Sequence, residues 1–202
     1  MRIRRLLGFG FILALLVMLI NSTMSWLQSD LLENAMSVAV RRQDAAAVEK
    51  AISRGGNARM LNSEDDPIIF WAVRYGDLRT TQALIAHGAD ADSRSHSGET
   101  LLMHAAGRVN TAILQLLLDA GASIDARDAF GFTALMYAIR ARQGENVKII
   151  LDHGAGLDYT SVDGATAASL AMECGDSTII DLIKRRSGDQ VRKSRVKSDM
   201  AN

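Results

Sequence analysis

The sequence repeats itself at a fixed period, and this period decides what the chain can fold into. Residues 98–130 and 131–163 align without a gap, so that Gly98 falls on Gly131 and Leu102 on Leu135. A period of roughly 20 to 50 residues is typical of a solenoid, in which each unit packs on its neighbours. Two positions carry the register further: Ala39, Ala72, Ala105, Ala138 and Ala171, and Gly55, Gly88, Gly121 and Gly154.

Within one period, the sequence predicts two helices. Gly-x-Thr occurs at 98–100, 131–133 and 164–166, and a threonine side chain caps a helix by accepting a backbone N–H. The pairs Gly88-Ala89, Gly121-Ala122 and Gly154-Ala155 each follow an apolar run. A glycine after such a run ends a helix in the left-handed conformation. Asp66 and Pro67 predict a cap followed by the first helical residue.

These residues resemble the ankyrin repeat, which opens on Gly-x-Thr-Pro-Leu and closes with Leu-Leu, then Gly-Ala-Asp and a hairpin. Most repeats here lack the proline, and Met103, Met136 and Ser169 replace the usual histidine. The resemblance covers about residues 31–187 and implies an all-α solenoid of helix–turn–helix units with short β-hairpin loops. Asp92, Asp125 and Asp158 fall at a position where ankyrin repeats usually have Asn or Asp. The resemblance implies that these side chains shape the turn by hydrogen bonding to the backbone.

The period divides the chain into seven segments. Residues 1–27 hold an N-terminal hydrophobic helix or signal peptide, and residues 188–202 form a basic tail that we expect to be disordered. Residues 28–63 are a degenerate capping repeat with a polar surface-facing helix, as an end repeat without a neighbour requires. The repeats proper are 64–96, 97–130 and 131–163, and residues 164–187 form the C-terminal capping repeat, with Asp176 as its second helix cap.

The formal net charge of zero hides an acidic body with basic ends. Residues 184–202 hold seven bases and two acids, and residues 1–5 hold three bases. The remaining residues, 6–183, contain 13 bases and 21 acids, a balance of −8. This balance, together with the location predicted below, disfavours nucleic acid as a partner. The single cysteine excludes an internal disulfide framework.

An uncharged apolar run over positions 6–20 follows Arg2, Arg4 and Arg5. It fits a signal peptide, although only Thr23-x-Ser25 approaches a cleavage site. It also fits an uncleaved membrane anchor with Trp26 at the interface, although the run is short of the ~20 residues that a span prefers. We favour the anchor. Both alternatives place the repeats on the extracytoplasmic side, which is the periplasm in a bacterium.

The resemblance implies a concave groove formed by hairpin tips and inner-helix ends, and arginines fall along it. Arg41, Arg74 and Arg140 each lie two residues after the inner-helix alanine, and Arg108 fills the gap at Gly107. Arg94 and Arg127 recur at the tips, and Tyr75, Phe130 and Phe132 lie beside the row. Arginine and aromatic residues dominate protein-binding hot spots. The alternative is that the arginines only favour the C-terminal helix dipole or are solvated.

No catalytic, metal or cofactor site is predicted. His87 and His153 end second helices two repeats apart, and the spacing of His96 and His104 is no metal signature. Cys174 has no histidine in its own repeat, so we expect an incidental thiol rather than a nucleophile. The sequence therefore predicts a non-catalytic module that binds a protein partner, with no small-molecule substrate, and whose groove suits an acidic segment. The alternatives are an accessory subunit of a periplasmic complex that binds through its outer helical face, and, less favoured, an enzyme with an unrecognised site.

Overall fold

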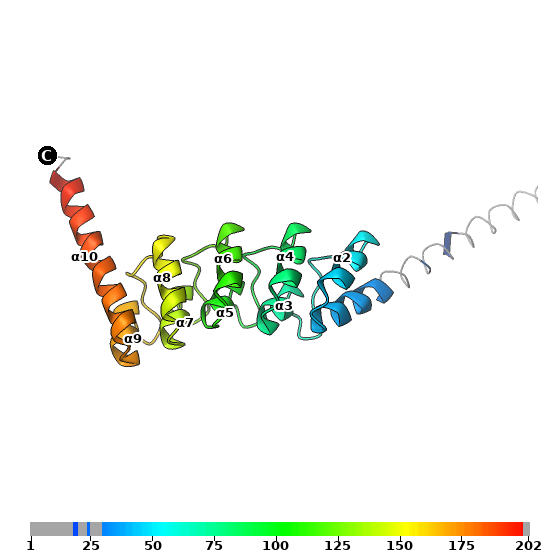
Figure 1. Cartoon of the computed structure of the whole chain (residues 1–202), viewed down its shortest axis with the longest axis horizontal. Helices are drawn as coiled ribbons and strands as arrows, with labels where there is room; N and C mark the ends of the chain where they lie inside the picture. Colours follow the sequence, from blue (N-terminus) through cyan, green and yellow to red (C-terminus); the bar gives the residue numbers. More distant parts are fainter. Residues whose placement is uncertain (1–17, 20–23, 25–29, 200–202) are drawn as a thin grey trace, which may run out of the picture.

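The computed structural model describes residues 18, 19, 24 and 30–199, with side chains to residue 188. After a first helix over residues 30–41, the helices are α2 (Ala45–Ser53), α3 (Ile69–Tyr75), α4 (Leu78–Ala86), α5 (Leu101–Ala106), α6 (Thr111–Asp119), α7 (Ala134–Arg140), α8 (Gly144–Asp152), α9 (Ala167–Cys174) and α10 (Ser177–Asp199). Figure 1 shows them as successive pairs standing side by side, with α3, α5, α7 and α9 in one row and α4, α6 and α8 in the other. The predicted all-α solenoid is confirmed for this part of the chain.

The predicted N-terminal hydrophobic helix over 1–27 falls almost wholly outside the described residues. Among the residues that are described, no helix is both long enough and apolar enough to cross a membrane.

The helix caps follow the predicted threonines and aspartates. Thr100, Thr133 and Thr166 accept the backbone N–H of the residue three positions on, at 3.2 to 3.4 Å. Asp44 caps α2 in the same way, and Asp176 accepts the backbone N–H of Thr178 at the start of α10. These bonds satisfy donors that a helix start otherwise leaves unpaired.

The predicted cap at Asp66 and Pro67 is wrong. Helix α3 begins at Ile69, with Ile68 as its N-cap and no side-chain cap. Pro67 instead forms an antiparallel bridge with Leu61, at the position that Thr166 holds in its bridge to Thr160. The carboxylate of Asp66 is buried against the following loop, where it accepts the backbone N–H of His96.

The predicted β-hairpins are reduced to single bridges. Within the described residues there are three isolated antiparallel bridges, Leu61 with Pro67, Arg94 with Thr100, and Thr160 with Thr166. Two of the three aspartates at the predicted turn position, Asp92 and Asp125, bond the next repeat rather than their own turn. Asp92 accepts the backbone N–H of Ser123 at 2.6 Å, and Asp125 accepts that of Gly156 at 3.0 Å.

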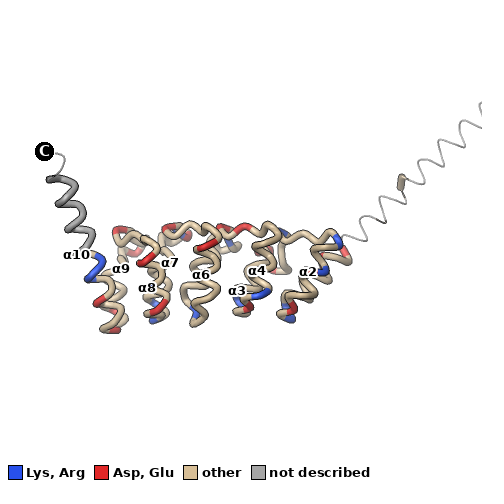
Figure 2. Tube along the Cα trace, turned by 45° about the horizontal axis from the view of Figure 1, so that its top comes forward, with Lys and Arg blue, Asp and Glu red and all other residues tan. Residues whose placement is uncertain are grey.

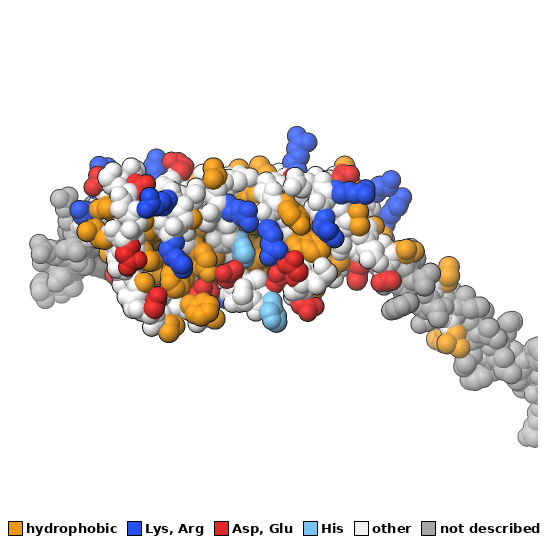
Figure 3. All heavy atoms as spheres, turned by 90° about the horizontal axis from the view of Figure 1, so that it is seen from below, with side chains coloured by type: hydrophobic (Ala, Val, Ile, Leu, Met, Phe, Trp, Pro, Cys, Tyr) orange, Lys and Arg blue, Asp and Glu red, His pale blue; other side chains and the backbone are white. Residues whose placement is uncertain are grey.

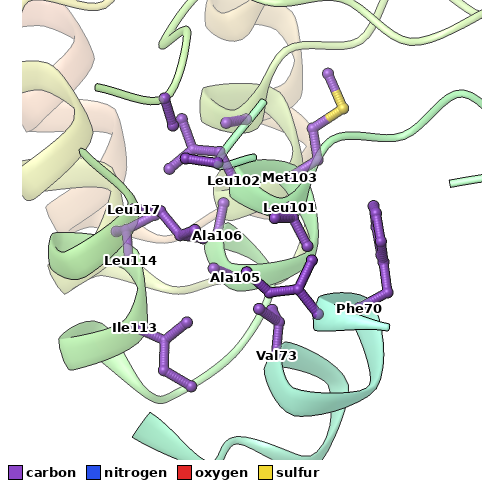
Figure 4. Close-up of a cluster of buried hydrophobic side chains, with 14 of the residues drawn as sticks. Phe70, Val73, Leu101, Leu102, Met103, Ala105, Ala106, Ile113, Leu114 and Leu117 are labelled. Atoms are coloured by element: carbon purple, nitrogen blue, oxygen red, sulfur yellow. The ribbon is translucent and has the colours of Figure 1, made fainter. Parts of the chain in front are cut away.

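One continuous apolar core runs through the array. Figure 4 shows part of it, where Leu101 and Leu102 of α5 meet Leu114 and Leu117 of α6, close to Phe70 of the preceding repeat. Leu117 is fully buried, and Leu135 occupies the position in α7 that Leu102 occupies in α5. Each repeat thereby covers its neighbour.

The C-terminal tail differs from the prediction of disorder over 188–202, because α10 continues to Asp199. Ile179 and Ile183 anchor the first half of α10 in the core. Beyond them the sequence is rich in Lys and Arg, which favour a helix even without a packing partner, and contains no proline.

Charge is distributed unevenly over the array. Figure 2 shows acidic residues recurring along the edge formed by the loops, which agrees with the acidic balance of the body. Figure 3 views the molecule from the side of α3, α5, α7 and α9, and shows a row of Lys and Arg side chains among hydrophobic patches.

Candidate functional site

The inner-helix arginines lie at corresponding helix ends. Arg41 ends the first helix, Arg74 lies in the last turn of α3, and Arg140 ends α7. Arg41 and Arg140 are exposed and Arg74 is half-buried. Arg108 is exposed just after α5, because Gly107 holds the corresponding position in that repeat. The structure therefore brings these four predicted residues to one side of the array.

Two of the arginines stack on aromatic rings. The guanidinium of Arg41 lies 5.5 Å from the ring centroid of Trp71 in the next repeat, and that of Arg140 lies 5.1 Å from the ring centroid of Phe132. A cation over an aromatic face is held by the ring quadrupole. A guanidinium has N–H groups along its edges, and a carboxylate can accept two of them.

Arg74 and Arg108 have other surroundings. Nη1 of Arg74 lies 2.9 Å from Oε2 of Glu64, and both side chains are partly exposed. The backbone carbonyl of Arg108 accepts a 2.6 Å hydrogen bond from Nδ2 of Asn146, a buried residue of α8 that also donates to Ala106. Asn146 thus holds the end of α5, and with it the backbone from which the Arg108 side chain extends.

The tip arginines hold the loops to one another. Nη1 of Arg94 donates to the carbonyls of Gly98 and Arg127, both at 2.9 Å. One repeat later, Nη2 of Arg127 donates to the carbonyl of Thr160 at 3.2 Å. Each tip arginine therefore ties its own loop to the corresponding loop of the next repeat, a structural role that the sequence analysis did not anticipate.

A hydrogen-bonded network beside the arginine row was missed by the sequence analysis. Nε2 of His104 lies 2.8 Å from Oε2 of Glu99, and the hydroxyl of Tyr137 lies 2.8 Å from Glu99 and 2.9 Å from Asp128. A hydroxyl has one hydrogen, so Tyr137 donates to one carboxylate at a time. Trp71, His104 and Tyr137 occupy the same position in three successive repeats, and this recurrence is the signal that could have found the network.

Burial and charge shift the pKa of two groups in this network. Burial lowers the pKa of His104 below its usual value, the nearby Arg74 and Arg108 lower it further, and Glu99 and Asp66 oppose the shift. Burial also raises the pKa of Tyr137, and its hydrogen bonds to the two carboxylates add to the shift. His104 is therefore neutral and Tyr137 protonated in the folded protein at pH 7.

The stability of the protein will fall as the pH drops from 7 to 5, partly because of His104. Since its pKa is lower in the folded protein than in the unfolded chain, the unfolded chain takes up the proton first, from about pH 6.5 downwards. Replacing His104 by glutamine should reduce the loss of unfolding free energy over this range, measured by urea denaturation at each pH. His87→Gln, at an exposed position, controls for removing a histidine. An unchanged pH dependence in His104→Gln would contradict this assignment.

The apolar members of the predicted site are divided between core and surface. Phe130 is 65% exposed and Tyr75 is 43% exposed, whereas Phe132 is buried beneath Arg140. Phe130 belongs to a pocket of about 750 Å³ between the last two repeats. Its lining includes Phe130, Phe132, Arg140, Val162 and Leu170, and the acids Asp128, Asp163 and Glu173.

The described residues include possible metal ligands and one thiol. They contain no group of three His, Cys, Asp or Glu side chains placed to hold a metal ion. Cys174 is a free thiol, half-buried, whose Sγ donates to the carbonyl of Ala171 at 3.2 Å. The arrangement offers an arginine row and an exposed aromatic side chain beside a pocket.

Comparison with known proteins gives one result. A family model described as ankyrin repeats (3 copies) matches residues 36–128 and 108–194, which together span most of the chain. No curated protein matches the chain at a significant level.

Proposed function

This chain belongs to the ankyrin-repeat family, and we propose that its groove binds an acidic segment of a partner protein. The family membership makes the chain a protein–protein interaction module. The acidic nature of the partner rests on the arginine row of Arg41, Arg74, Arg108 and Arg140.

The observation that supports this proposal most strongly is the stacking of Arg41 on Trp71 and of Arg140 on Phe132. A side chain that is already ordered loses less entropy on binding than a freely moving one. If the arginines only interacted favourably with the C-terminal ends of the helix dipoles, they would not need to lie over aromatic rings. Adjacent helix pairs pack about 10 Å apart, and an extended chain advances about 3.3 Å per residue. A segment with a carboxylate at about every third residue therefore matches the row.

Charge reversal tests the groove with a matched control. The double variant Arg41→Glu/Arg140→Glu changes both stacked arginines, and Arg79→Glu/Arg142→Glu makes the same change at exposed positions of α4 and after α7. Charge-assisted hydrogen bonds contribute about 1.5–3 kcal/mol each. We expect the groove variant to bind at least about 10-fold more weakly than wild type, and the control to bind as wild type does.

The measurement is capture from a native extract, followed by titration of the captured protein against each folded variant. A partner lost by the groove variant and kept by the control supports the proposal. Equal binding by wild type and the groove variant would contradict it. Loss only in the control would contradict the groove proposal, and loss in Arg79→Glu alone, on α4, would favour the accessory-subunit alternative, in which the outer helical face binds.

We also propose that the array is tethered to a membrane on its extracytoplasmic side, in the manner of a bacterial exported protein. The support is the uncharged run 6–20 behind three arginines. Secretion after cleavage is the alternative. Amino-terminal sequencing of the protein from its native source decides between them, since an intact Met1 or Arg2 contradicts cleavage. Protease treatment of spheroplasts, in which the outer membrane is opened and the inner membrane is intact, tests the side. Repeats that resist the protease until the inner membrane is permeabilised would contradict the proposal.

A further inference from the structure

The outward face of the first helix, residues 30–41, is apolar where the sequence analysis expected a polar end. Leu31 and Val38 are 65% and 47% exposed. Leu31 lies seven residues before Val38 in the same helix. Apolar residues at a spacing of seven lie on one side of a helix and are typical of a side that pairs with another helix.

The corresponding surface is covered in the following repeats. Ala35 of the first helix is exposed, yet the residues at its position in the next two repeats, Ile68 and Leu101, are fully buried. Those repeats have a preceding repeat packed against them, and the first helix has none among the described residues. Two open hollows of about 600 and 440 Å³ lie on this face, and both include Leu31 and Ala35.

We propose that two copies of this chain associate through this end face, with their first helices side by side and parallel. The face is defined by Leu31, Asn34, Ala35, Val38 and Arg42 of the first helix, with Asp44, Ala47 and Arg54 beside it. The association is separate from the groove and does not depend on the groove's partner.

Charge favours a second copy over an anionic lipid surface. The face combines apolar side chains with charges of both signs, which are positive at Arg42 and Arg54 and negative at Asp44. In a twofold interface, each copy contributes the same patch, and the two patches face each other. Such a patch must therefore be complementary to itself. A face that bound anionic lipid would instead be uniformly basic.

Two further features agree with a parallel pair. Asn34 lies between Leu31 and Val38, and a polar residue within an apolar pairing stripe fixes the register of two helices. The preceding residues join the array at the start of the first helix. In a parallel pair, the starts of both first helices therefore lie on the same side, which agrees with the membrane tether proposed above.

Molecular mass is the first test. The full chain in a non-ionic detergent should sediment with the protein mass of two copies, and Leu31→Glu/Val38→Glu should sediment with the mass of one. Val162→Glu is the matched control, because Val162 is an exposed valine at the far end of the array. It should keep the wild-type mass. A wild-type chain with the mass of one copy at tens of micromolar would overturn the proposal, whether lipid or another protein covers the face.

Cross-linking is the second test and does not depend on a disruptive variant. In a Cys174→Ser background, Asn34→Cys is the only cysteine and should form an intermolecular disulfide under mild oxidation. Gln82→Cys, an exposed position on α4, should not. Equal cross-linking at both positions, or none at Asn34→Cys, would contradict the parallel pair.

Discussion

Replacing Leu117 or Leu135 by alanine is expected to lower the free energy of unfolding by about 2–5 kcal/mol in each case. Both side chains are buried in the continuous core, Leu117 in α6 and Leu135 in α7. The loss combines the transfer free energy of the removed methyl groups with the cost of the cavity left behind, since neighbouring repeats hold the walls of that cavity in place. The total free energy of unfolding of a native protein is only about 5–15 kcal/mol, so a loss of this size is a large part of it.

The measurement is chemical denaturation followed by circular dichroism, with Val109→Ala as the control. Val109 is 82% exposed, so its replacement should change the unfolding free energy by no more than about 0.5 kcal/mol. A loss below about 1 kcal/mol in both leucine variants would show that the core register is wrong.

Replacing Gly131 by alanine is expected to cost about 2–4 kcal/mol, through backbone strain and a steric clash. Gly131 has a φ of +82°, and a Cβ there would lie 2.8 Å from Nη2 of Arg127, 3.1 Å from Cα of Ser161 and 3.3 Å from the carbonyl oxygen of Thr160. The last two atoms belong to the backbone of the next loop. Nη2 of Arg127 donates to the carbonyl of Thr160, so the added methyl group would also displace the side chain that ties this loop down.

Gly164 provides the matched control for this prediction. It occupies the same position in the next repeat with nearly the same φ, +85°, but a Cβ there would meet no atom within 4 Å. Gly164→Ala should therefore cost only the strain of the left-handed conformation, about 1–2 kcal/mol. The difference between the two variants, measured by denaturation under the same conditions, isolates the clash. Equal losses would mean that the loop of residues 160–161 yields to the added methyl group.

The sequence was sufficient to predict the repeat architecture because the same local demands recur in each repeat. A threonine that caps a helix, such as Thr100, and a glycine in the left-handed conformation, such as Gly121, are required by the backbone of their own repeat. The buried position of Leu117 likewise follows from a helix with one apolar side. Such requirements are visible without knowledge of the neighbouring repeats.

Side-chain contacts between repeats could not be predicted in this way. Asp66 was assigned a cap because it precedes Pro67, but its carboxylate turns to the next loop. Arg94 and Arg127 were assigned to the groove surface, and their donors bond carbonyls of the following repeat. The link from His104 through Glu99 to Tyr137 joins two repeats. Each depends on the offset between neighbouring repeats, which local spacing does not contain.

The bonds from one loop to the next have a consequence for how the array opens. Because Asp92, Arg94, Asp125 and Arg127 each reach into the following repeat, the central repeats are coupled on both sides, whereas an end repeat is coupled on one. Local opening should therefore begin at the ends, and amide hydrogen exchange should be slowest in α5 to α7. Arg41 and the α9 side of the pocket beside Phe130 lie in the parts of the array that open first. The ends of the groove can then adjust to a ligand while its centre remains rigid.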